Sequence, residues 1–579
     1  MSPYRPPISD TLFLYRDVFQ LDQDWQSWNH SNGLNLELAE AILIESGKLA
    51  TDVLEPLSRP GDEEGAHWQD GKVRAPTGFQ KAFLDIAGGG WLGLGGNPDW
   101  GGQGMPKSIG CAVEEFFWGS NTSLWLYASL TLGATHCIDA HGSQEIKQLY
   151  LRPMYEGRWT GAMALTEPHA GTDLGMIRTR AEPLTDGSYR LDGMKIFITS
   201  GEHDLCENIV HLVLARLVDA PAGTKGISLF LVPKFLPDSQ GQPSQRNGFS
   251  SISIEEKMGI HGSATSTIVY DNAIGYMVGE PNRGLSCMFT MMNFARVSVG
   301  LQGLGLAERA YQLAVDYSKE RLQGRVPTGP VNVDGPADPL IEHADIRRML
   351  LTQRVYTEGS RALAILVAHQ LDLTQYSMVP ENREQAQRFV DLLTPIAKSF
   401  MTDRAMESVL LAQQCFGGHG YIRETGVEQI VRDTRISQIY EGTNGIQALD
   451  LVGRKVVQNS GEYVLEFAEF MRQSVSSGTY ADEVNCAIDD WVKVSQDICA
   501  RSRERIEFAS AVAVDYLDLS GHVIYAWIWK RMADCDDGTF GKKHLARYYF
   551  DKIFPIAKSH LARISAGPDA ITLPASSWF

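Results

Sequence analysis

One carboxylate near the end of the chain, Glu441, lies in the segment with the clearest chemical pattern. Segment 432–447 reads RDTRISQIYEGTNGIQ, so Ile439 and Tyr440 precede the carboxylate and Gly442 follows it. Glycine lets the backbone approach a ligand closely, and apolar neighbours raise the pKa of a carboxylate by desolvating it. A desolvated carboxylate beside exposed backbone N–H groups could act as a general base. A solvated turn residue is the alternative for such a glutamate considered alone.

Three other blocks of sequence, all before this glutamate in the chain, extend the pattern. QQCFGGHGY occupies residues 413–421, MALTEPHAGTDLG occupies 163–175, and KIFITSG occupies 195–201. The first, together with the YEGT run, resembles the C-terminal signature of the acyl-CoA dehydrogenase flavoenzymes. The second resembles the flavin-binding segment of that family, and the third resembles its flavin-stacking strand. Ordered blocks at family spacing are specific evidence, whereas an isolated EGT tripeptide is weak.

The resemblance implies the removal of two hydrogens across Cα–Cβ of an acyl-CoA thioester, which yields a 2,3-enoyl-CoA. An α-proton is too weak an acid for a carboxylate in water, so the site needs a desolvated base and donors for the enolate-like charge. By resemblance Glu441 is the base, its N–H and a flavin ribityl hydroxyl hold the carbonyl, and flavin N5 takes the hydride. Some members carry the base just before an arginine in a bundle helix, where this chain has Ala295 before Arg296.

FAD is the cofactor that the resemblance implies, and twelve positions match family contacts. Six belong to the two upstream blocks: Met163, Leu165, Thr166, Thr172, Phe197 and Thr199. Phe197 stands where tryptophan is common, and a phenyl ring can still cover a flavin face. Six lie further along: Arg321, Gln323, Gln414, Gly417, Gly418 and Thr443. The neighbouring subunit supplies the first two of these in the family, which implies a homodimer or a higher oligomer.

The elements that must carry these residues form a mainly α fold with a small β domain. Hydrophobic periodicity changes near residues 160 and 281, and the resemblance supplies the architecture. We expect an N-terminal helical domain, a middle β-barrel, a C-terminal four-helix bundle with the catalytic loop, and a helical extension, over residues 1–159, 160–280, 281–460 and 461–579.

Apolar spacing predicts helices in the first domain over 34–53, 111–117 and 146–154. The glycine-rich stretch 83–106 fits neither the Walker loop nor the dinucleotide fingerprint, so we expect a packed irregular loop there. A position near the acyl-CoA site, implied by the resemblance, is the functional alternative.

Short apolar or alternating runs predict strands in the middle domain over 188–199, 209–215, 226–232 and 266–270. Gly and Pro between them favour an antiparallel barrel or sandwich, with 237–248 as a polar surface loop.

Long helices are predicted in the bundle over 288–319, with an interruption near 300–305, and over 345–370 and 384–414. The extension reads as helices over 464–474, 484–516, 523–533 and 542–555, for which packing or assembly is the expected role.

Composition excludes several function classes. The 579-residue chain has a formal net charge of −18, which disfavours binding to a nucleic acid backbone. Its eight cysteines show no zinc spacing, and no metal site is predicted. No apolar run approaches the ~20 residues of a membrane span, so we expect a cytoplasmic protein.

The function expected from these features is dehydrogenation of a fatty acyl-CoA or of 3-methylthiopropanoyl-CoA, within lipid metabolism such as fatty acid β-oxidation. An electron-transferring flavoprotein is the expected electron acceptor. The alternatives are an acyl-CoA oxidase, a nucleic-acid-associated flavoprotein of the same superfamily, and a catalytically dead helical scaffold.

Overall fold

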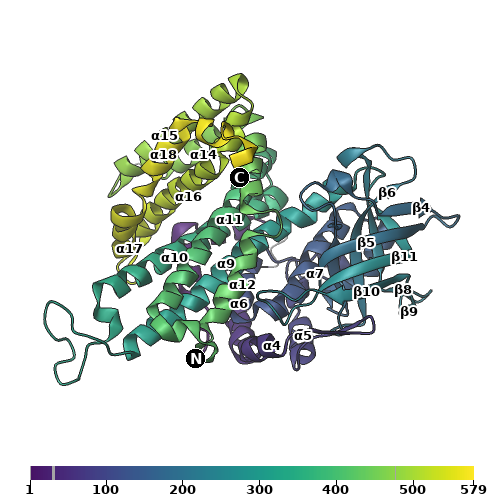
Figure 1. The fold of residues 1–579 in the computed structure, drawn as a ribbon, viewed down its shortest axis with the longest axis horizontal. Coiled ribbons are helices and arrows are strands. Elements are labelled where there is room, and N and C mark those ends of the chain that lie inside the picture. Colours follow the sequence, from purple (N-terminus) through teal and green to yellow (C-terminus); the bar gives the residue numbers. More distant parts are fainter. Residues whose placement is uncertain (1, 29–32, 476, 579) are drawn as a thin grey trace. The chain divides into compact units, whose positions relative to one another are not determined.

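The computed structural model describes residues 2–28, 33–475 and 477–578, and these divide into two compact units. The helical unit takes in the described residues of Met1–Gly47, Lys107–Gly119 and Val299–Phe579. The barrel unit comprises Lys48–Pro106 and Ser120–Ser298. The mainly α fold with a small β domain is confirmed (Figure 1). The division into four domains at the predicted boundaries stays a prediction.

Seven strands form the main sheet of the barrel unit: β3 Trp159–Ala164, β4 Arg180–Pro183, β5 Tyr189–Thr199, β6 Asn208–Leu217, β7 Ile227–Pro233, β10 Phe249–Ile254 and β11 Thr265–Val278. β11 pairs with β5, β5 with β4, β4 with β6, β6 with β7, and β7 returns to β11, which closes a ring. The predicted antiparallel arrangement holds for most strand pairs, but β4 and β6 run parallel, as do β3 and β6. The reason is that β6 pairs with β4 instead of its sequence neighbour β5.

Both faces of β6 are buried as far as Ala215, which explains why the strand is apolar from Ile209 to Ala215 except at His211. Ile209, Val213 and Ala215 join one hydrophobic cluster with residues of β7 and β11. Val210, Leu212 and Leu214 face the other way, in a cluster with helices α7 Thr122–His141 and α8 Gln144–Tyr155. The period-two alternation of a strand therefore distributes its side chains between two cores.

Two predicted loops contain regular structure. Within 237–248, a hairpin forms from β8 Phe235–Pro237 and β9 Pro243–Arg246. Within 83–106, α5 Phe79–Gly88 covers the first residues, and two single 3₁₀ turns interrupt the irregular remainder. The glycines there allow close backbone approach, since a Cβ on Gly102 would lie 2.1 Å from the carbonyl carbon of Gly96.

The remaining elements of the first 120 residues are short. They are helices α1 Ile8–Phe13, α2 Leu21–Ser27, α3 Leu36–Leu49, α4 Ser58–Glu64 and α6 Lys107–Ser120, and the hairpin β1 His67–Gln69 with β2 Lys72–Arg74. The hairpin was not predicted from the sequence.

Three long helices dominate the bundle: α9 Gly284–Glu320, which starts in the barrel unit and continues into the helical unit, α10 Ala344–Tyr376 and α11 Pro380–Cys415. The predicted interruption of α9 near residues 300–305 was wrong. Its glycines serve helix packing instead: a Cβ on Gly303 would lie 3.1 Å from the Cβ of Ala405, and one on Gly305 would lie 2.6 Å from the nitrogen of Gly119. Short helices α12 Val427–Arg435 and α13 Asn444–Asp450 follow α11.

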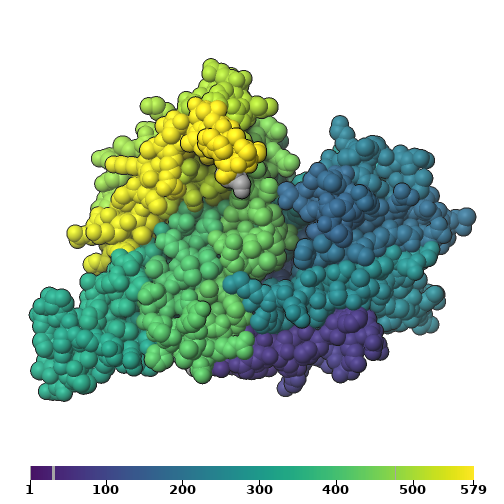
Figure 2. All heavy atoms as spheres, in the orientation of Figure 1, coloured from purple at the N-terminus to yellow at the C-terminus, as the bar shows by residue number. Residues whose placement is uncertain are grey.

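The extension consists of α14 Glu462–Gln473, α15 Ala481–Glu504, α16 Glu507–Cys535, α17 Lys542–Tyr548, α18 Ile556–Ala566 and α19 Asp569–Thr572. The predicted helix 484–516 was wrong, because α15 ends at Glu504 and the backbone of Arg505 is extended. The next helix, α16, then runs without interruption through residues 517–522, where a gap between two helices was predicted. Gly521 lets α16 pack closely on α11, since a Cβ there would lie 2.3 Å from the ring of Phe400. In the space-filling view the extension, lime green to yellow, lies on the green bundle (Figure 2).

A buried cluster of charges connects the extension to the bundle. Arg361 on α10 contacts Asp10 at 2.6 Å, Glu115 at 2.7 Å and Glu308 at 2.7 Å, and its side chain is 2% exposed. Lys542, at the start of α17, pairs with Asp10 and with Glu358. Buried charges must be paired to be tolerated, so this cluster fixes the positions of segments that are far apart in the sequence.

Candidate active site

Glu441 lies in a sharp reversal of the chain between the 3₁₀ turn Ile436–Gln438 and α13. Its φ is +56° and that of Gly442 is +84°, so two successive residues are left-handed. A left-handed residue other than glycine costs about 1–3 kcal/mol, and such residues cluster at functional sites. The side chain of Glu441 is half-buried. The carboxylate thus lies on a strained turn, and neighbouring residues must stabilise the left-handed conformation of that turn.

Side chains on either side of Glu441 anchor this turn within the helical unit. The Tyr440 hydroxyl donates to Oε1 of Gln302 on α9 at 2.5 Å, and burial together with the charge of Glu441 raises the pKa of Tyr440. The amide nitrogen of Gln447 donates to the carbonyl oxygens of Glu441 at 3.1 Å and Gly442 at 3.3 Å.

Asn444 fastens the start of α13 to α11. Its Nδ2 donates to Asp403 Oδ1 at 2.8 Å and to Thr402 Oγ1 at 3.0 Å, while Lys398 Nζ donates to its Oδ1 at 2.8 Å. Thr443, a predicted cofactor contact, caps α13 by accepting from the N–H of Ile446 at 3.4 Å. The turn around Glu441 therefore rests on two long helices, α9 and α11.

Two further predicted cofactor segments meet in the helical unit. Arg321 and Gln323 follow α9, while Gln414 lies in the last turn of α11, just before the 3₁₀ turn that contains Gly417 and Gly418. Near the end of α9, the ring of Tyr317 stacks on Phe416 with centroids 4.3 Å apart, so the two segments are neighbours. A Cβ on either Gly417 or Gly418 would meet nothing within 4 Å, which leaves their backbone accessible.

Asp338 organises the loop that carries Arg321 and Gln323. Its main-chain carbonyl accepts from the N–H of Gln323 at 3.0 Å, next to a bridge between Leu322 and Pro339. Its buried carboxylate accepts from the N–H groups of Asn332 at 2.8 Å and Val326 at 3.0 Å. These bonds, that of Asn332 first, lower the pKa of Asp338 to about 2.

The barrel unit carries the other six predicted contacts, at the ends of β3 and β5 and between them. The Thr166 carbonyl accepts from the N–H of Ile196 at 2.9 Å, which joins the two segments. Phe197 is 59% exposed and has a φ of +59°, an unusual state for an aromatic residue near the end of a strand. An exposed phenyl ring near the half-buried hydroxyl of Thr199 fits the face and polar edge of a flavin ring.

A buried ion pair fixes the same region. Lys195 Nζ lies 2.9 Å from Glu167 Oε1 and 2.9 Å from the Leu165 carbonyl. Glu167 also accepts from the hydroxyl of Thr179 at 2.6 Å and from the N–H of Arg178 at 2.7 Å. Burial lowers the pKa of Lys195 to about 8 despite the opposing charge of Glu167. Burial would raise the pKa of Glu167, but Lys195 and the hydrogen bonds keep it below its ordinary value.

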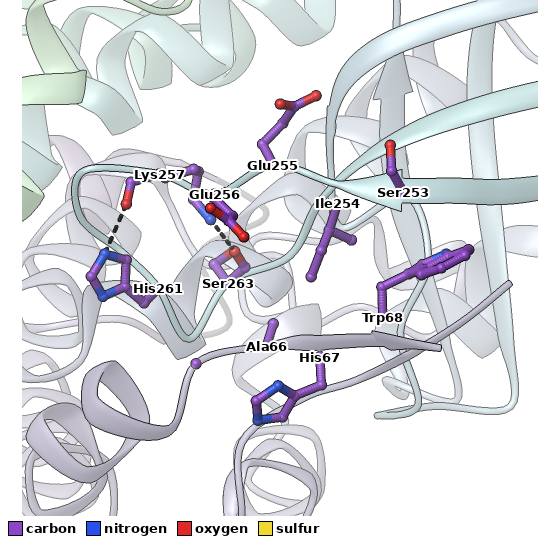
Figure 3. Close-up of a pocket in the computed structure, with 11 residues that line it drawn as sticks. Ala66, His67, Trp68, Ser253, Ile254, Glu255, Glu256, Lys257, His261 and Ser263 are labelled. Carbon is purple, nitrogen blue, oxygen red and sulfur yellow. Dashed lines mark hydrogen bonds between the residues drawn. The ribbon is translucent and has the colours of Figure 1, made fainter. Parts of the chain in front are cut away.

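A separate cavity of about 460 Å³ lies in the barrel unit between the β1 region and segment 253–263 (Figure 3). Its walls are largely bonded to each other: Lys257 donates to the Ser263 carbonyl at 2.7 Å, and His261 pairs with the Lys257 carbonyl at 2.8 Å. None of the predicted site residues lines it. In the part of the chain that the structure describes, no cluster of three or more potential ligands could hold a metal, and no helix is long and apolar enough to cross a membrane.

Sequence reasoning did not single out the residues that hold the site together. Lys195 and Glu167 belong to the two recognised upstream blocks, and Gln447 ends the recognised YEGT segment. Their positions within these blocks were the available signal. Gln302 carried none, because its partner Tyr440 is 138 positions away. Asp338 lies outside the recognised blocks, although its partners Asn332 and Val326 are near it in the sequence.

Four family models match the chain in order. They are acyl-CoA dehydrogenase, N-terminal domain, over residues 53–158; middle domain, over 162–273; C-terminal domain, over 282–456; and acetyl-CoA dehydrogenase C-terminal like, over 463–573. The last model covers the extension, which is therefore a recognised part of such proteins.

Individual relatives agree with these matches. A 3-methylmercaptopropionyl-CoA dehydrogenase of Ruegeria pomeroyi is 45% identical over 81% of this chain and 79% of its own length. A broad-specificity linear acyl-CoA dehydrogenase of Mycobacterium tuberculosis is 33% identical over 89% and 84%. The acyl-CoA dehydrogenase of Bacillus anthracis complexed with FAD shares the fold, with a TM-score of 0.74 and 20% identity over 94% and 89%. This chain belongs to the acyl-CoA dehydrogenase family and is an FAD-dependent oxidoreductase.

Proposed function

We propose that this protein dehydrogenates an acyl-CoA thioester between Cα and Cβ to a 2,3-enoyl-CoA, with Glu441 removing the α-proton. The observation that supports this role most directly is the left-handed, half-buried Glu441 in a turn anchored to α9 and α11. A base held by the backbone is aligned before the substrate arrives, which lowers the entropic cost of proton transfer. Bound FAD supplies the acceptor for the β-hydride.

The twelve matched positions are proposed to hold the cofactor. In the barrel unit, Phe197 would cover a ring face, and Thr166 and Thr199 would meet its polar edge. In the helical unit, Arg321 and the accessible backbone of the Gly417–Gly418 turn are suitable donors for a diphosphate. By resemblance, Arg321 and Gln323 would serve the partner's cofactor in a homodimer.

For the acyl group we propose 3-methylthiopropanoyl or a fatty acyl chain. The identity of 45% to the Ruegeria relative, against 33% to the linear acyl-CoA enzyme, favours the first. An electron-transferring flavoprotein is the proposed electron acceptor. An anaerobic titration with 3-methylthiopropanoyl-, butanoyl-, octanoyl- and hexadecanoyl-CoA should bleach the flavin band with one chain class. A flavin that stays oxidised with all four would refute this substrate proposal.

Glu441→Gln tests the base. The amide keeps the shape of the side chain but cannot accept the proton, so the variant should retain FAD and bind acyl-CoA while losing nearly all turnover. Ala295, at the alternative base position of the family, has no group that could take over. Substantial flavin bleaching by Glu441→Gln would show that another residue is the base.

A further inference from the structure

Gln447 is a buried side chain next to Glu441 that the proposed chemistry does not use. It lies in the second turn of α13 and is 0% exposed. Its amide nitrogen reaches back to two consecutive carbonyl oxygens, those of Glu441 and Gly442. Only the NH₂ end of the amide can donate, so these partners fix the orientation of the group.

The two carbonyls belong to the two left-handed residues. The Glu441 carbonyl defines the plane of the peptide that joins Glu441 to Gly442, and the Gly442 carbonyl defines the next peptide plane. One amide group therefore holds the consecutive peptide planes that follow the base. The left-handed φ of Glu441 is disfavoured for a residue with a Cβ, so it persists only where such bonds outweigh its cost.

The glycine that follows the base makes room for this amide. A Cβ on Gly442 would lie 2.6 Å from Nε2 of Gln447, closer than real contacts allow. On the other side of the base, Tyr440 is held by Gln302. Glu441 is thus fixed before and after by two glutamines, one on α9 and one on α13.

We propose that Gln447 is a positioning residue that holds Glu441 in its left-handed conformation, so that the carboxylate points where the α-proton will be. This inference rests on the proposed role of Glu441 as the base. Without the two hydrogen bonds, the turn relaxes towards ordinary φ values and the carboxylate moves.

Gln447→Met tests the proposal, because methionine keeps the length and volume of glutamine without its donors. Misplacing a reacting group by about 1 Å costs roughly 100-fold in rate, so we expect kcat for flavin reduction to fall between about 10- and 100-fold. The KM for acyl-CoA and the amount of bound FAD should stay near their wild-type values.

Gln353→Met is the matched control. Gln353 on α10 is also 0% exposed, and its amide nitrogen donates to the Met349 carbonyl at 3.1 Å. Both variants remove a buried helical amide, and both should lower the melting temperature. Only Gln447→Met should lower kcat. An equal loss of kcat in both variants would reduce the role of Gln447 to general stability and overturn the proposal.

A double-mutant cycle separates this inference from the proposed function. If Gln447 acts through the base, Gln447→Met should cause no further loss in a Glu441→Gln background, measured as single-turnover flavin bleaching. An inactive Glu441→Gln with a fully active Gln447→Met would refute the positioning role alone. An active Glu441→Gln would refute the base itself.

Discussion

Lys195 and Glu167 form an ion pair at 2.9 Å with side chains that are 0% and 3% exposed. Each comes from a different block of the predicted flavin site, and Lys195 also donates to the carbonyl of Leu165, two residues before Glu167. A charge removed from water is stable only while its partner remains. The pair therefore fixes the end of β3 relative to β5, where Phe197 and Thr199 lie.

Lys195→Met should disrupt this arrangement. Removing one partner of a buried pair costs about 3–5 kcal/mol, because the remaining charge is uncompensated. We expect a lower melting temperature and a flavin that dissociates during gel filtration, followed by the ratio of flavin to protein absorbance. Lys195→Met with Glu167→Gln removes both charges and should recover part of the stability. A Lys195→Met variant with wild-type stability and flavin content would contradict this role.

Phe197→Ala should weaken FAD binding without destabilising the apoprotein. The ring is 59% exposed, so its loss removes little packing from the fold itself. Covering a flavin face with it buries apolar area worth about 1.5–3 kcal/mol, a loss of roughly 10- to 100-fold in affinity. Phe197→Trp, which restores the common family residue, is the matched control and should keep tight binding. Equal FAD dissociation constants for all three proteins would place the ring outside the site.

The sequence was sufficient to predict the flavin-site residues and the strand that carries them. It did not predict the distant side chains that hold the site in place. The alternation over residues 188–199 predicted β5, because burial on one face imposes a period of two. Glycines were misread in α9: Gly303 and Gly305 predicted a break, yet they serve contacts with Ala405 and Gly119, which only the folded structure brings close. Gln302, which binds Tyr440 from 138 positions away, illustrates the same limit.

Lys542→Met should loosen the extension from the bundle. The Lys542 side chain is 1% exposed and pairs with Asp10 and Glu358, which would be left partly unbalanced. We expect a loss of about 3–5 kcal/mol in the free energy of unfolding and faster proteolysis within residues 461–579. Lys543→Met, the neighbouring residue on α17, is an exposed control that should change stability by less than about 0.5 kcal/mol. Equal effects of the two substitutions on stability and proteolysis would show that the ion pairs of Lys542 do not anchor the extension.

The raised pKa of Glu115 should make the stability of the protein depend on pH. Burial raises its pKa from 4.5 to about 7, although Arg361 opposes this, and Glu308 and Asp10 add like charge. The folded state therefore binds more protons than the unfolded state between pH 4.5 and 7, so stability falls as pH rises through that window.

At about 1.4 kcal/mol per pKa unit, this destabilisation reaches about 3 kcal/mol at high pH. Glu115→Gln keeps the shape of the side chain and cannot ionise. Urea unfolding at pH 5 and pH 8 should show wild-type stability falling more steeply than that of Glu115→Gln. The difference between the two proteins is the quantity to compare, because other groups titrate in both. Parallel pH profiles would mean that Glu115 stays ionised beside Arg361 throughout, with the cluster's excess negative charge neutralised at a different carboxylate.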